Sequence, residues 1–207
     1  MGLIARETGG SKYPPVEQGL HHAICYATYD LGTHFDDKWN KSAHKIVIIF
    51  ELPEERIDIE KNGESLNLPR AISKKYTLSL HEKSKLRKDL ESWRGRVFTQ
   101  EELEGFDVSK LLGVNCMVQV LHSTVDGKTY ANITAITSLP KGFEKRNAEN
   151  PLAYFSLEED GKELPDSMPE WIQKIIKESD EWVGKGTKEA PPSNDNPPPP
   201  GDDDIPF

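Results

Sequence analysis

The sequence has few cysteines, no long apolar run and no excess of positive charge. Its two cysteines, Cys25 and Cys116, are too few for a disulfide-rich secreted fold, and both lie in apolar, strand-like runs where buried reduced thiols are expected. No stretch approaches the roughly 20 apolar residues of a membrane helix. The first apolar run, residues 2–5, is too short for a signal peptide. We therefore expect a protein of the reducing cytoplasm, with no membrane association.

The charge balance excludes a protein coated in positive charge. The formal net charge is -9, from 26 Lys and Arg against 35 Asp and Glu. Residues 186–207 hold five acids and one base, so residues 1–185 carry 25 bases against 30 acids and are only mildly acidic. A local basic groove is still compatible with this balance, because the distribution of charge matters more than its sum.

The low apolar content of 35%, with 15 prolines and 15 glycines, indicates that part of the chain lies outside a compact core. A length of 207 residues favours one domain with appendages. We expect a flexible N-terminal arm (1–18), a main domain (19–140) with a helical insert (82–113), a C-terminal extension with a helix (141–183), and a disordered Pro-rich linker with an acidic tip (184–207). The last segment has too few apolar residues to fold by itself.

Three apolar runs in the first half are typical of strands. Residues 20–32 form a long apolar run that ends at Gly32, residues 45–52 (KIVIIFEL) indicate a central strand, and residues 72–82 alternate apolar with polar side chains. Residues 33–44, between the first two runs, are expected to form a polar loop with embedded aromatic residues.

Two tight turns predict β-hairpins and their registers. Asn62-Gly63 is a strong type I′ signal, which places Ile59 opposite Leu66 and Ile57 opposite Leu68. Asp126-Gly127 centres a second hairpin over residues 114–139. The pairs expected there are Val120 with Ile133, Val118 with Ala135, Gln119 with Thr134, and Leu121 with Asn132. One face of this hairpin is apolar and the other is mostly polar, which suits the wall of a barrel.

The middle of the chain is expected to be helical. Residues 83–93 place Leu86, Leu90 and Trp93 on one stripe and end before Gly95, a suitable C-terminal cap. Thr99 and Glu102 match a capping box, Asp107 is expected to cap a third short helix, and a late helix is expected over residues 168–182. The pattern predicts a mainly β protein with an OB-fold, a five-stranded barrel that has a helical insert between strands 3 and 4.

The last segment, NDNPPPPGDDDIPF (residues 194–207), places two large apolar side chains after a block of like charge. Prolines keep such a segment extended, and aspartates keep it soluble and attract basic surfaces. Ile205 and Phe207 supply apolar anchors, and Pro206 lowers the entropy lost on binding. We expect a tethered segment that binds a basic pocket with an apolar floor.

The residues DDDIPF closely resemble the C-terminal tip of bacterial single-stranded DNA-binding proteins. In that family an OB-fold binds the strand, and the tip recruits replication, recombination and repair proteins. The resemblance implies that the partner-binding residues are Asp202, Asp203, Asp204, Ile205, Pro206 and Phe207. The body is longer than in an ordinary bacterial member, so the chain looks more like a phage-encoded member acting in a bacterial host cell. A homo-oligomer stays open as a further interaction.

Residues 70–96 hold the only concentrated basic charge, with nine bases against three acids. Single-stranded DNA needs cations for its phosphates and flat side chains for its bases. The candidates from this segment are Arg70, Lys74, Lys75, Thr77, Lys83, Lys85 and Arg87. For the helix residues 83–88, a solvated face with ordinary i,i+4 ion pairs is an equally good alternative. Lys74 and Lys75, on a strand beside the expected groove, favour DNA contact.

Aromatic residues supply the other candidates. Phe35 and Trp39, with Lys41 close by, lie in the position of the first OB loop, which commonly lines the groove. Packing on the barrel rim is an equal alternative for both rings, and Tyr130, near the last turn, is a weaker candidate. Trp171 and Trp182 are expected to dock the late helix or to make an oligomer contact. The predicted function is binding of single-stranded DNA with little sequence specificity, without a cofactor or metal.

Two other functions fit less well. A small nuclease could use His21, His22 and Cys25 as metal ligands, but a strand places the two histidines on opposite faces and no second ligand pair follows. The chain has no phosphate-binding glycine loop or nucleophile elbow, so we expect no enzyme. An adaptor that uses the tail to engage repair proteins without binding DNA is the second alternative, because the body has no net positive charge.

Overall fold

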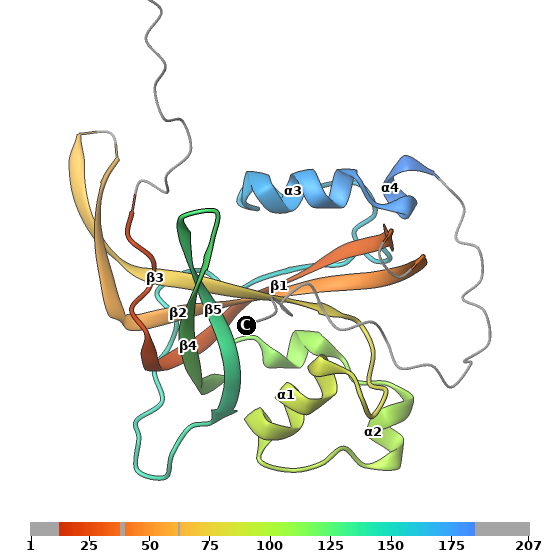
Figure 1. Ribbon diagram of the computed structural model, residues 1–207, viewed down its shortest axis with the longest axis horizontal. Helices are drawn as coiled ribbons and strands as arrows, with labels where there is room; N and C mark the ends of the chain where they lie inside the picture. The colour runs from red at the N-terminus through yellow and green to blue at the C-terminus, as the bar shows by residue number, and fades with distance from the viewer. Residues whose placement is uncertain (1–12, 38–39, 62, 185–207) are drawn as a thin grey trace, which may run out of the picture.

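The computed structural model describes residues 13–37, 40–61 and 63–184. The protein is mainly β, and its strands form one sheet in the order β3-β2-β1-β4-β5, with β6 beside β1 (Figure 1). The strands are β1 (Gly19–Asp36), β2 (Lys41–Lys61), β3 (Glu64–Thr77), β4 (Asn115–Val125), β5 (Lys128–Ser138) and β6 (Ala153–Phe155). The five long strands pair antiparallel, and β6 runs parallel to β1. The expected five-stranded arrangement is present, but as an open sheet.

Strand β1 is the centre of the sheet. Its first residues, Gly19 to Ile24, pair with β4, and the rest pairs with β2. The expected loop at residues 33–44 is wrong, because β1 continues to Asp36 and Phe35 lies opposite Ser42. A register irregularity between Asp30 and Gly32, where Gly32 has a φ of 78°, lets the strand bend and continue.

The first predicted hairpin register is confirmed, since Ile59 lies opposite Leu66 and Ile57 opposite Leu68. In the second hairpin, the pairs Val120–Ile133 and Leu121–Asn132 are confirmed. The other two pairs are wrong: Val118 lies opposite Ile136, and Gln119 opposite Ala135. A bulge between Gln119 and Val120 shifts the register by one residue.

The helical segment between β3 and β4 follows the predicted caps. Its elements are α1 (Lys85–Arg94), α2 (Gln100–Glu104) and the short 3-10 helix η1 (Val108–Leu111). Gly95 caps α1 in the left-handed conformation, Thr99 and Glu102 form the capping box, and Asp107 caps η1. The late helix is split by Ser179 into α3 (Glu170–Lys177) and α4 (Asp180–Val183).

Two apolar clusters hold these layers together. On one face of the sheet, α1 buries Leu86, Leu90 and Trp93 against strand residues such as Phe50, whose ring centre lies 5.4 Å from that of Trp93. On the other face, β6 and α3 cover β1 and β2, with Ile172 and Ile176 buried. Figure 1 shows α1 and α3 on opposite sides of the sheet.

Both cysteines are buried and free, as expected, and burial raises the pKa of Cys25 to about 12. Near the start of the described chain, Val16 is buried in the first cluster and Arg70 donates to the carbonyls of Pro14 and Pro15. This end of the expected arm therefore packs against the sheet. Within the described ranges, no helix has the length and apolar character needed to cross a bilayer.

Several predictions lie outside the described residues. They concern most of the N-terminal arm, Trp39, and the whole of residues 185–207 with the acidic tip. They stay predictions, as does the division of the chain into domains.

Candidate nucleic-acid interface

The neighbours Lys74 and Lys75 point to opposite faces of β3. Lys74 is 9% exposed, and its Nζ lies 2.8 Å from Asp89 Oδ2 of α1, which also accepts a 2.7 Å hydrogen bond from the Tyr76 hydroxyl. Lys75 lies on the opposite face and is exposed. The two cannot contribute to one surface, because side chains alternate along a strand. Lys74 connects α1 to the sheet, and we leave it out of the candidate interface.

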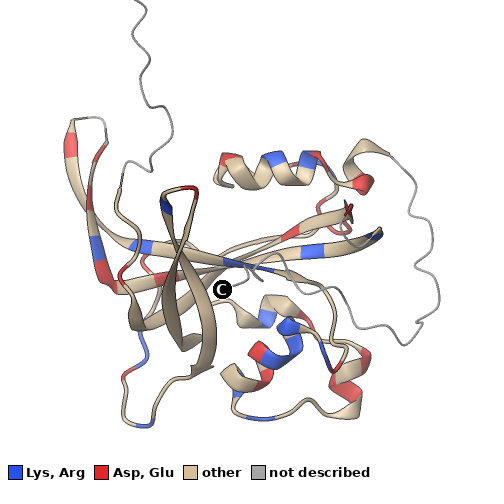
Figure 2. Cartoon of the chain, viewed as in Figure 1, with Lys and Arg blue, Asp and Glu red and all other residues tan. Residues whose placement is uncertain are grey.

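Most other cations of residues 70–96 also have partners within the protein. Arg87 Nε donates to Glu91 Oε1 over 2.9 Å, the i,i+4 pair named above as the alternative for this helix. Arg94 and Arg96 both bind Glu102, and these contacts, with the Thr99 N–H, lower its pKa to about 2, with Arg96 as the largest cause. Figure 2 shows Lys and Arg mixed with Asp and Glu over α1 and α2. This segment therefore presents no uniformly basic face.

Lys75 has a different setting, on the face opposite α1. Its Nζ lies 5.8 Å from the centre of the Trp171 ring of α3, within reach of a cation–π interaction. Trp171 is 42% exposed, and Ser73 of β3 and Lys174 of α3 are exposed as well. A flat ring and a cation thus lie side by side on an accessible surface.

Two roles were expected for Trp171, docking of the late helix or an oligomer contact; the ring does not dock the helix, and the oligomer contact stays a prediction. The helix docks through Ile172 and Ile176 instead, which are fully buried. Their i,i+4 spacing marks the buried stripe of α3, and Trp171 falls beside that stripe. This spacing is the signal by which the sequence could have identified an exposed tryptophan. Trp182, in contrast, is half-buried and packs against the second cluster, as expected.

The remaining candidates lie on several separate elements. Phe35 is 54% exposed near the end of the β1–β2 hairpin, next to the exposed Lys41, and Tyr130 is 49% exposed in β5. Figure 1 shows the β1–β2 hairpin end and the β4–β5 hairpin toward opposite ends of the sheet. The other three are Thr77, half-buried at the end of β3, Lys83, exposed before α1, and Lys85, half-buried in α1. The predicted residues therefore do not form one cluster.

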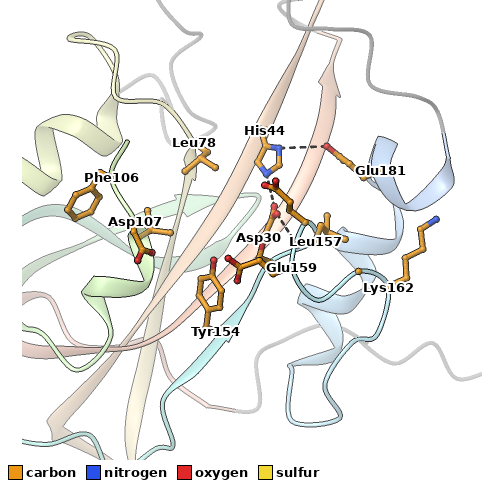
Figure 3. Close-up of a pocket in the computed structure, with 14 residues that line it drawn as sticks. Asp30, His44, Leu78, Phe106, Asp107, Tyr154, Leu157, Glu159, Lys162 and Glu181 are labelled. Atoms are coloured by element: carbon orange, nitrogen blue, oxygen red, sulfur yellow. Dashed lines mark hydrogen bonds and ion pairs between the residues drawn. The ribbon is translucent and has the colours of Figure 1, made fainter. Parts of the chain in front are cut away.

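A titratable network lies where α4 meets β1 and β2 (Figure 3). His44 Nε2 donates to Asp30 Oδ1 over 2.7 Å, and Asp30 also accepts from the Gly32 N–H. Burial disfavours the charged form of Asp30, but the hydrogen bonds from His44 and Gly32 outweigh this effect, so the pKa of Asp30 is lowered. The same hydrogen bond to Asp30 raises the pKa of His44. Glu181 of α4 accepts from the N–H and hydroxyl of Thr33, which ties α4 to the sheet.

The histidines considered as metal ligands have separate partners. His21 Nδ1 lies 3.2 Å from Glu55, and His22 Nε2 lies 2.7 Å from the Asn115 side-chain oxygen. In the part of the chain that the structure describes, no group of three His, Cys, Asp or Glu side chains could hold a metal ion. The described residues thus offer an exposed surface but no metal centre. Comparisons of the chain with protein-family models, curated proteins and solved structures find no match.

Proposed function

We propose that the protein binds single-stranded DNA with little sequence specificity. The observation that carries this proposal is the exposed pair of Lys75 and Trp171, with the Lys75 Nζ 5.8 Å from the centre of the ring. Proteins that bind single strands without reading sequence combine cations for the phosphates with aromatic rings for stacking, because every base has a flat face. Lys174, on the helix α3 that carries Trp171, adds a second exposed cation.

The strand arrangement supports the same proposal. We infer an OB-type fold, because five antiparallel strands follow in chain order with α1 between the third and fourth. OB-folds bind oligonucleotides on the face of strands 2 and 3 and with the loops that join strands 1–2 and 4–5. Lys75 lies on β3, Phe35 and Lys41 belong to the β1–β2 hairpin, and Tyr130 to the β4–β5 hairpin. In this proposal α3 adds Trp171 to the OB surface.

The acidic segment supplies a second part of the function. Its three aspartates followed by Ile205, Pro206 and Phe207 resemble the partner-binding tip of bacterial single-stranded DNA-binding proteins. We propose that this segment recruits replication, recombination and repair proteins to the DNA that the sheet holds, in the cytoplasm of a bacterial cell. Ile205 and Phe207 are the apolar anchors, and the aspartates select a basic pocket.

A fluorescence titration tests DNA binding. Oligo-dT added at low salt is expected to quench tryptophan emission, with an affinity that falls as salt rises because phosphate contacts release counterions. Duplex DNA of equal length is expected to bind more weakly. No response to the single strand, or tighter binding of the duplex, would contradict the proposal.

One observation favours an adaptor as the second candidate. Most of the nine cations in residues 70–96, among them Arg70, Lys74, Arg87, Arg94 and Arg96, make contacts within the protein, so they contribute less to a DNA-binding surface than their number suggests. An adaptor is expected to bind the receptors of the acidic tip while giving no gel shift with single-stranded DNA. The same titration therefore separates the two functions.

A further inference from the structure

A cavity of about 480 Å³ lies between η1, the β1–β2 hairpin, the segment after β6, and α4 (Figure 3). A smaller chamber of about 70 Å³ adjoins it, and the two share Asp30, Leu78, Val108, Tyr154 and Ser156 among their lining residues. The larger volume falls within the range of small-molecule sites. Neither chamber includes Lys75 or Trp171, so this site is separate from the proposed DNA surface.

The inner chamber contains an unpartnered hydroxyl. Thr28 lines this chamber, is 1% exposed, and its Oγ1 has no hydrogen-bond partner among the described residues. Buried hydroxyls in proteins nearly always have a partner, so an unpaired one in the wall of a chamber is a place where a polar group of a ligand can supply the missing hydrogen bond. A valine has the same shape and would fill the position without an unpaired polar atom.

The outer chamber selects for positive charge. Five carboxylates line it, against one lysine and one histidine: Asp30, Asp107, Glu158, Glu159 and Glu181, with Lys162 and His44. Lys162 Nζ donates to the carbonyl of Trp182 and points away from the acids in Figure 3.

Two of the acids are available to a ligand. Asp30 and Glu181 are occupied by His44 and Thr33, whereas Glu158 and Glu159 make no hydrogen bond or ion pair with any described residue. The carboxylates at the mouth of the outer chamber repel an anion and attract a cation.

Between the Thr28 hydroxyl of the inner chamber and the carboxylates of the outer chamber, the cavity walls are apolar and aromatic. Leu78, Val108 and Leu157 provide aliphatic surface, and Phe106 and Tyr154 provide rings that attract an ammonium ion. A bare metal ion does not fit this combination, because the carboxylates of the described residues do not converge on one point. A ligand with an aliphatic stem and an ammonium group matches the walls, the acidic mouth and the inner hydroxyl together.

We propose that this cavity binds an aliphatic primary ammonium group. Such a group has two sources, a free alkyl diamine or the side chain of a lysine on another protein. In either case the carboxylates of Glu158 and Glu159 attract the ammonium group as it enters, the stem lies against Leu78 and Tyr154, and the ammonium group donates to Thr28 Oγ1. A diamine places its second ammonium group beside the carboxylates at the mouth.

Thermal unfolding of the full chain tests the proposal. At pH 7 and low salt, 1,5-diaminopentane is expected to raise the melting temperature in a saturable manner, because a ligand of the native state stabilises it by mass action. The uncharged 1,5-pentanediol and magnesium chloride at equal ionic strength serve as controls. No shift with the diamine, or an equal shift with either control, overturns the proposal.

Variants of the chain assign the effect to this cavity. Thr28→Val is expected to weaken diamine binding by about tenfold or more, as the loss of a hydrogen bond to a charged group does, while the free protein keeps its melting temperature or gains stability. Thr28→Ser, which keeps the hydroxyl, is expected to retain binding. The double change Glu158→Gln with Glu159→Gln is expected to reduce binding as well. Unchanged binding in both Thr28→Val and the double variant overturns the assignment.

A second ligand separates the two sources. Nα-acetyl-lysine amide presents the same ammonium group on a blocked residue. If it binds at least as tightly as the diamine, the site is assigned to a lysine side chain of a partner. Tighter binding of the diamine assigns it to a free amine. The affinity for oligo-dT is expected to be the same in all three cavity variants, so failure of this proposal is distinguishable from failure of the proposed function.

Discussion

The Nζ of Lys74 lies 2.8 Å from Asp89 Oδ2, and this ion pair connects β3 to α1 beneath the surface. Both side chains are largely buried, and the Tyr76 hydroxyl shares the same carboxylate oxygen. The adjacent Lys75 points to the other face, toward Trp171. Two consecutive lysines therefore have different roles, one in stability and one in the proposed DNA contact.

Replacement of Lys74 tests this division. Lys74→Met leaves Asp89 without its counter-charge, so we expect a loss of about 3–4 kcal/mol in unfolding free energy, the lower part of the range for broken buried pairs. The affinity for oligo-dT is expected to change less than about twofold, well under the cost of one phosphate contact. Urea denaturation and titration measure the two quantities, with the exposed Lys83→Met as control. A stable Lys74→Met protein that binds DNA poorly contradicts this role.

Gly32 couples β1 to the C-terminal helices. It has a φ of 78°, and a Cβ built there lies 2.5 Å from Ser179 Cβ, the residue that caps α4. We expect Gly32→Ala to destabilise the protein by more than the roughly 1–2 kcal/mol of left-handed strain alone, because the methyl group displaces Ser179. Gly184→Ala is the matched control, with a φ of 70° and no atom within 4 Å of the added Cβ. Equal losses in the two variants, measured by thermal unfolding, rule out the steric coupling.

The His44–Asp30 hydrogen bond predicts a pH window of stability. The pKa of His44 is raised, so its contribution is complete below its usual value of 6.5 and is lost as pH rises through the raised value. The pKa of Asp30 is lowered, so its contribution is present above the usual 3.8 and is lost as pH falls through the lowered value. The pair therefore stabilises the fold most between these two usual values.

We expect His44→Gln to remove this window. Relative to the unmodified protein, the variant should lose about 1 kcal/mol or less near pH 5, because His44 is partly exposed, and nearly nothing near pH 9. Urea denaturation at several pH values measures the difference. A loss that is constant from pH 5 to pH 9 contradicts the assignment to His44 ionisation.

Local patterns in the sequence predicted the parts of the fold that neighbouring residues determine. The Gly95 cap of α1, the Thr99–Glu102 capping box and the register at Gly63 all depend on residues a few positions apart, and all are confirmed. The continuation of β1 beyond Gly32 was missed, because a glycine in the left-handed region ends a strand in some settings and bends it in others. The bulge at Gln119 has no local signal either.

The candidate site was predictable to a smaller extent for the same reason. Lys75 is exposed as expected, since alternation along a strand shows which side chains share a face. Lys74 was assigned to the surface because the sequence of β3 alone does not show its partner Asp89, which lies on α1. For Trp171 the sequence left docking of the late helix and an oligomer contact open, because the position of α3 over the sheet is a tertiary feature. The chamber near Thr28 is lined by residues from five separate segments of the chain, and no local sequence pattern predicts it.

Removal of residues 185–207 tests the proposed role of the acidic segment. Under the hypothesis that its aspartates compete with DNA for cationic side chains, the shortened protein is expected to bind oligo-dT more tightly, with the greatest gain at low salt, where charges are least screened. Capture of purified replication and repair proteins is expected to be lost. Weaker DNA binding after removal contradicts the competition.

The most direct test of the central claim compares Lys75 and Trp171 with a matched pair of the same chemistry. Lys162 Nζ lies 5.7 Å from the centre of the Trp182 ring, so Lys162→Ala and Trp182→Ala control for the loss of a cation and of a ring elsewhere. Affinity for oligo-dT is measured across a salt series for all four variants. We predict that Trp171→Ala weakens binding by about five- to 150-fold, the range for one stacked base, and that Lys75→Ala lowers the salt slope by about 0.7, while the control pair changes neither quantity. Equal effects of the two pairs, or no effect of Lys75→Ala and Trp171→Ala, would contradict the account.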